Sequence, residues 1–172
     1  MPPHCDSLDG PVVRAARAAL AAGDADLVLS YVPAAGEDEV RAAFGRVLPL
    51  QASGGEAAAV AQLWFFETVV RIHRAGEGAS YTGLKPAGLD VGPVIPLAEK
   101  AVESGDGEPV RRLLADELRA ELADRLRRVG QLAAAKDASL PAARAHVQAM
   151  LGFQVYAHHV LQAIHAAPHE HG

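Results

Sequence analysis

Histidine, cysteine and glutamate side chains occur at three places in the sequence where they could bind a metal ion. At the first place, His4 and Cys5 are adjacent in a short arm that ends at the predicted helix start Asp9-Gly10-Pro11. Imidazole and thiolate are ligands that zinc, copper and nickel prefer, and an arm can present them without helical constraint. The simpler alternative is a frayed terminus with an incidental cysteine. We expect His4 and Cys5 to contribute to a metal site.

The second place is the segment 60–77, which is apolar on nearly every side of a helix yet carries charged residues and a histidine. Glu67 and His73 are six residues apart. On a helix they diverge by about 120° and lie about 9 Å apart along the axis, so they need help to bind one ion. Glu67 also shares a stripe with Arg71 and Arg74, which favours a structural carboxylate–guanidinium cluster as the alternative.

The third place is His158 in the last predicted helix. It lies mid-stripe between Gln154 and Gln162, one turn away on either side, and the apolar residues Val147, Leu151 and Leu161 share the same stripe. A lone histidine on such a face is more often a satisfied core residue than a ligand. His159 points about 100° away and is not expected to share the site.

These three places support a first hypothesis, in which His4 and Cys5 meet His158, with His73 or Glu67, near one end of a helical bundle. The site would hold a transition metal ion: copper, nickel, iron or zinc. The chain would then be a metal-binding protein and a small metal-dependent oxidoreductase. The sequence does not decide whether it is an enzyme, and it leaves a small-molecule substrate and a homo-oligomer open.

Two other hypotheses require no metal. In one, the chain is a non-enzymatic interaction or structural module whose buried polar residues pair with one another. That reading predicts that Arg71→Ala costs about 3–5 kcal/mol if it breaks a buried pair. In the other, Trp64, Phe66 and Tyr81 line a small-molecule pocket under the loop 76–94.

Helices must position all of these residues, because apolar residues recur at helical spacing between glycine and proline breaks. No strand pattern or fixed repeat is evident. We predict an all-α fold, an antiparallel bundle of four to five helices with a long Gly/Pro-rich loop over 76–94. One domain spans 1–172, with an N-terminal arm at 1–10 and a frayed tail at 168–172. The predicted helices are 12–22, 24–31, 36–48, 56–75, 97–103, 108–135 and 142–167.

Composition excludes several classes of protein. The chain has 172 residues, 50% of them hydrophobic, and a net charge of −5. The negative charge and the lack of a long basic run argue against nucleic-acid binding. No apolar run reaches the ~18 residues of a membrane span, and no signal-peptide pattern is present, so we expect a cytoplasmic protein. A single cysteine rules out an intrachain disulfide.

Two motifs resemble a family of small bacterial helical proteins known only as a domain of unknown function. The first is His4-Cys5-Asp6-Ser7-Leu8-Asp9-Gly10-Pro11, and the second is Arg71-Ile72-His73-Arg74-Ala75-Gly76-Glu77-Gly78. The opening His-Cys-Asp is also similar to the metal hook of nickel superoxide dismutase, itself a helical bundle. Here Met-Pro-Pro precedes the histidine and a second cysteine is missing. These departures argue against a nickel dismutase and leave a related metal hook on a bundle open.

Overall fold

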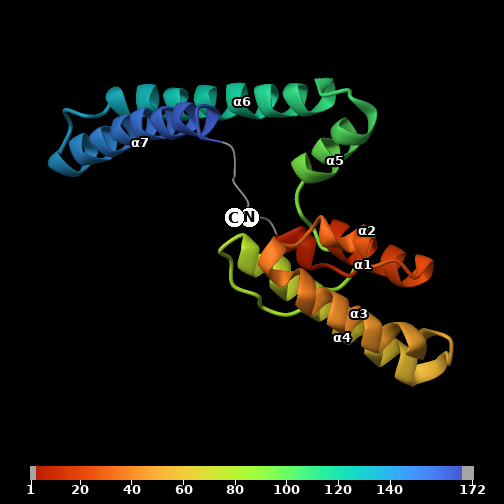
Figure 1. Cartoon of the computed structure of the whole chain (residues 1–172). Coiled ribbons are helices and arrows are strands. Elements are labelled where there is room, and N and C mark those ends of the chain that lie inside the picture. Colours follow the sequence, from red (N-terminus) through yellow and green to blue (C-terminus); the bar gives the residue numbers. More distant parts are fainter. Residues whose placement is uncertain (1–2, 168–172) are drawn as a thin grey trace. The chain divides into compact units, whose positions relative to one another are not determined.

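The computed structural model describes residues 3–167, and this part of the chain is helical (Figure 1). Within it, extended residues pair only at one isolated parallel bridge, between Ser7 and Lys85. The predicted all-α class is confirmed. The arrangement of the helices as one antiparallel bundle stays a prediction, and the predicted frayed tail at 168–172 lies outside the described residues.

The helices of the described residues follow the predicted ones, with differences at their ends. Pro96 lies in the first turn of its helix and Pro49 in the last turn of another, so each helix extends across a proline where the sequence predicted a boundary. The helices are α1 (Pro11–Ala22), α2 (Asp26–Leu29), α3 (Glu37–Gln51), α4 (Gly55–Gly76), α5 (Val94–Ser104), α6 (Glu108–Ala133) and α7 (Leu140–Ile164), with short 3-10 helices η1 (Pro3–Asp6) and η2 (Ala34–Gly36).

The chain divides into two compact units, one up to Val91 and one from Gly92. The first contains the arm and α1–α4, and the second contains α5–α7. The long loop predicted over 76–94 is present between α4 and α5. The expectation of a single domain over 1–172 stays a prediction.

The core of the first unit lies between α1, α3 and α4. Phe44 on α3 meets Phe65 on α4 edge to face, with ring centroids 5.9 Å apart. Valines dominate the rest of the fully buried set: Val12, Val13, Val28, Val40, Val47, Phe66, Val69 and Val70. Burial of these side chains supplies the main stabilisation of the unit.

The segment 60–77 is apolar on nearly every side, which is typical of a helix buried all round, but the N-terminal half of α4 is exposed on one side. Val60, Leu63 and Trp64 are 61%, 44% and 42% exposed, whereas Phe65 and Val69 are fully buried. The physical reason is that an apolar surface is buried only where another element covers it. The groove beside Val60 and Trp64 is lined by residues of α3 and α4 alone.

The second unit is built on a hairpin in which α7 packs alongside α6 (Figure 1). Arg125 of α6 lies 4.1 Å from the ring centroid of Tyr156 on α7 and pairs with Glu121 at 2.6 Å. α6 also carries exposed ion pairs between neighbouring turns, such as Arg119–Asp116 at 3.0 Å. Exposed pairs of this kind belong to a face in water and contribute little to stability.

Candidate functional site

The N-terminal arm and the end of α4 form a buried polar cluster, consisting of Asp6, His73, Arg74 and Glu77. Arg74 Nε donates to Asp6 Oδ1 at 2.6 Å and Nη1 donates to Glu77 Oε2 at 3.0 Å. The side chains of Asp6, Arg74 and Glu77 are only 4%, 4% and 2% exposed. The hydrogen bond to Asp6 raises the pKa of Arg74 above its ordinary value, so Arg74 keeps its positive charge between the two carboxylates.

Backbone hydrogen bonds hold the arm in place beside the loop that follows α4. The Lys85 N–H donates to Asp6 O at 2.8 Å, and the Leu8 N–H donates to Lys85 O at 3.0 Å. Asp9, at the predicted helix start, accepts a hydrogen bond from the Gly88 N–H at 2.7 Å, and this bond lowers the pKa of Asp9. The arm and the long loop therefore brace each other, and the α1 N-cap residue is Gly10 without a side-chain cap.

His73 has an oxygen atom near each of its ring nitrogens. Nδ1 lies 2.7 Å from Tyr31 O, and because a carbonyl oxygen only accepts, Nδ1 carries the hydrogen. Nε2 faces Glu77 Oε1 at 3.3 Å. With its hydrogen on Nδ1, a neutral His73 keeps on Nε2 the lone pair that a metal ligand must offer, on the side of the ring that faces Glu77.

The residues predicted to bind a metal come from different elements of the fold. His4 Nε2 and Cys5 Sγ are 3.8 Å apart in η1, whereas Glu67 is exposed on α4 and His158 is exposed on α7, in the second unit. Between residues 3 and 167, no three or more His, Cys, Asp or Glu side chains are grouped so that they could hold a metal ion. The metal site predicted from the sequence stays a prediction for all five of its residues: His4, Cys5, Glu67, His73 and His158.

The two arginines expected to share a cluster with Glu67 have other partners. Arg71 pairs with Glu39 of α3 at 2.5 Å, where both side chains are about half exposed. Arg74 pairs with Asp6 and Glu77. The pairing of Arg74 with Glu77 could have been predicted from the sequence, since Glu77 lies three residues beyond Arg74 on the same helical face. Nothing in the local spacing of the sequence points to Asp6.

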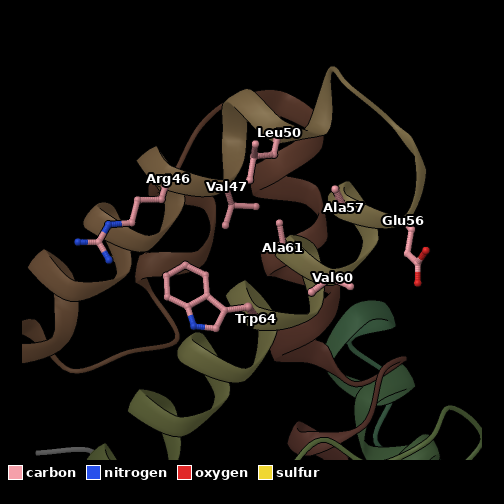
Figure 2. Close-up of a pocket in the computed structure, with 8 residues that line it drawn as sticks. All are labelled: Arg46, Val47, Leu50, Glu56, Ala57, Val60, Ala61 and Trp64. Carbon is pink, nitrogen blue, oxygen red and sulfur yellow. The ribbon is translucent and has the colours of Figure 1, made fainter.

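An apolar groove lies between the end of α3 and the start of α4 (Figure 2). Its volume is about 690 Å³. The indole of Trp64 forms one wall, while Arg46 and Glu56 lie on opposite sides of the rim and point away (Figure 2). The lining residues are Arg46, Val47, Leu50, Glu56, Ala57, Val60, Ala61 and Trp64.

This groove replaces the pocket that the sequence predicted around Trp64, Phe66 and Tyr81. Phe66 is only 1% exposed and belongs to the core, so it cannot line a pocket with Trp64. On a helix the two residues are also about 200° apart, which turns them to nearly opposite sides. Tyr81 packs against the core from the long loop, and its burial raises the pKa of the phenol.

Comparison with known families gives one match. The model of a family of unknown function, DUF6448, matches residues 9–156. The chain belongs to this family. Membership of DUF6448 fits the expected resemblance to an uncharacterised family. The matched region begins after His4, Cys5 and Asp6, so the match does not address the similarity of these three residues to the nickel dismutase hook. Searches of the curated proteins and of the solved structures found no match.

No helix between residues 3 and 167 is both long enough and apolar enough to cross a membrane.

Proposed function

We propose that this chain is a non-enzymatic interaction module whose groove between α3 and α4 binds an amphipathic helix of a partner protein. The observation that carries the proposal is Trp64, which is the only tryptophan of the sequence and stands half exposed over an apolar groove. Tryptophan is enriched among the residues that dominate binding energy at protein interfaces, where it fills a desolvated pocket.

The shape and charge of the groove favour a helix as the ligand. Ala57 and Ala61 are one turn apart and leave a shallow channel, which Val60 and Trp64, also one turn apart, flank on one side. Helix-in-groove recognition uses this type of apolar channel. Arg46 and Glu56 on opposite sides of the rim would orient a helix that carries an acidic residue on one side and a basic residue on the other.

The first test uses Trp64 as its own reporter. Designed amphipathic peptides, apolar on one face and with acidic and basic residues flanking it, are titrated into the protein. We expect the Trp64 emission to shift to shorter wavelength as the indole leaves water. Val60→Glu, which places a charge in the groove, is expected to weaken binding by at least tenfold, since each 1.4 kcal/mol is a factor of ten.

Val102→Glu is the matched control for that experiment. Val102 is 86% exposed on α5 in the second unit, so the same substitution there should leave the titration unchanged. If no peptide shifts the emission, or if both variants bind like the wild type, the groove is not a helix-binding site.

Metal binding by the arm is a second candidate function. It is favoured by the 3.8 Å separation of His4 Nε2 and Cys5 Sγ, and by His4 Nδ1, which is buried and has no hydrogen-bond partner among the described residues. An imidazole and a thiolate at this separation could provide two ligands for copper, nickel, iron or zinc. An oxidoreductase activity would depend on which metal is bound.

Elemental analysis of protein purified without an affinity tag tests this second function. Near-stoichiometric metal is expected to fall several-fold in Cys5→Ser, and occupancy should decline in acid because both ligands bind in their deprotonated forms. His159→Ala, a histidine outside the predicted site, is the control. Metal-free protein that also fails to bind added metal would remove this candidate and leave the groove proposal untouched.

A further inference from the structure

The outward face of α7 is an apolar stripe that the described structure leaves exposed. Leu140, Val147 and Leu161 recur every seven residues and are between 45% and 62% exposed, with Gln154 completing the series. Leu151, one turn beyond Val147, is 50% exposed. The sequence 145–165 also contains no Asp, Glu, Lys or Arg. A seven-residue apolar repeat is the pattern of helices that pair along their length.

The two long helices of this unit differ in what their outward faces are suited to contact. The outward face of α6 carries paired charges such as Arg111–Glu108 and Arg127–Asp124, as expected for a surface in water. The outward face of α7 offers no such charges. In addition, none of α5, α6 and α7 contains a fully buried residue, so the hairpin has little core of its own. A partner on α7 would supply the missing burial.

We propose that this face of α7 is a homodimer interface, in which α7 packs antiparallel against α7 of a second copy about a two-fold axis at Gln154. A two-fold contact must be self-complementary: if residue i meets residue j, then j also meets i. The stripe meets this condition, because Val147 and Leu161 lie seven residues before and after Gln154. Each therefore faces the other across the axis.

Gln154 gives the contact its register. A carboxamide both donates and accepts hydrogen bonds, so two glutamines related by the axis can satisfy each other. A single polar residue within an apolar repeat is known to select one alignment of paired helices at some cost in stability. The absence of charge over 145–165 removes the like-charge repulsion that two identical faces otherwise create.

The size of the contact sets the expected strength. A helix of the length of α7 spans about 37 Å, and a face about 11 Å wide on each copy gives a contact of roughly 800 Å² in total. This area lies below that of a standard stable interface, so the dimer should exchange with monomer and form as the protein concentration rises.

Sedimentation equilibrium of the full chain over a wide range of concentrations tests the interface. The wild type is expected to move from monomer to dimer, and Leu151→Glu is expected to weaken the dimer at least a hundredfold by placing a charge in each copy of the face. Leu126→Glu is the matched control, because Leu126 is 56% exposed on α6. It should dimerise like the wild type. A wild type that is monomeric at every concentration overturns the proposal, as does equal loss in both variants.

Cysteine crosslinking tests the axis itself and does not depend on how a charged variant folds. In a Cys5→Ser background, which removes the only native thiol, Gln154→Cys should form a disulfide-linked dimer with oxidised glutathione as oxidant. His159→Cys, exposed on another side of α7, should not crosslink. Equal crosslinking at both positions would exclude a two-fold axis at Gln154. Val60→Glu should leave the dimer intact, which separates this proposal from the groove on the first unit.

Discussion

Arg74→Ala is expected to lower the free energy of unfolding of the first unit by about 3–5 kcal/mol, the cost of leaving buried charge without its partner. Arg74 is the cation that lies between the carboxylates of Asp6 and Glu77, and all three side chains are almost completely buried. Without the guanidinium, two carboxylates remain in a site with little access to water. Because Asp6 belongs to the arm and Glu77 to the end of α4, the arm should also detach.

Arg71→Ala is the control for this prediction. The sequence suggested that Arg71 takes part in a buried pair, but its side chain is 47% exposed and its partner Glu39 is 57% exposed. An exposed pair contributes about 0–1 kcal/mol. Urea unfolding followed by the emission of Trp64, which lies in the first unit, measures both variants. Similar losses from Arg71→Ala and Arg74→Ala would contradict the assignment of Arg74 as the buried cation that holds the arm.

Gly10→Ala is expected to lower the free energy of unfolding of the first unit by about 3 kcal/mol, the upper part of the range for overpacking a tight site. A Cβ at this position would stand 1.9 Å from His4 O. The obstructing atom is backbone, so no side-chain rotation relieves the contact. The arm must move as a whole, and the bond between Asp6 and Arg74 moves with it.

A glycine in an open position provides the comparison. Gly45 lies within α3, and a Cβ there meets no atom within 4 Å. Gly45→Ala should therefore stabilise the unit by about 0.5–1 kcal/mol, since alanine favours a helix over glycine. The same urea titration measures both glycine variants. A Gly10→Ala protein as stable as the wild type would show that the arm does not pack this closely.

A double-mutant cycle links the two large predictions. If Gly10→Ala acts by displacing the arm, then it already separates Asp6 from Arg74. Arg74→Ala should then lower the free energy of unfolding by less in that background than in the wild type. The combined loss should be smaller than the sum of the single losses. Strict additivity would mean that the two residues stabilise the unit independently.

The sequence by itself determined the features that depend on neighbours along the chain. Helical periodicity, the proline of Asp9-Gly10-Pro11 and the glycine breaks are local, so the helices and the long loop after α4 could be placed within a few residues. The motifs that pointed to an uncharacterised family were also local. The family match now covers residues 9–156. Local steric and hydrogen-bond rules decide these features before any tertiary contact forms.

The tertiary structure decided which residues meet. Arg74 bonds to Asp6, a residue 68 positions away, and helical spacing, which pointed to Glu67, carries no information about a partner so distant in the chain. Packing likewise decided which apolar residues are buried: Phe65 is covered, while its neighbour Trp64 stands beside the groove. A side chain is buried or paired according to the element that covers it, and a pattern within one helix does not specify that element.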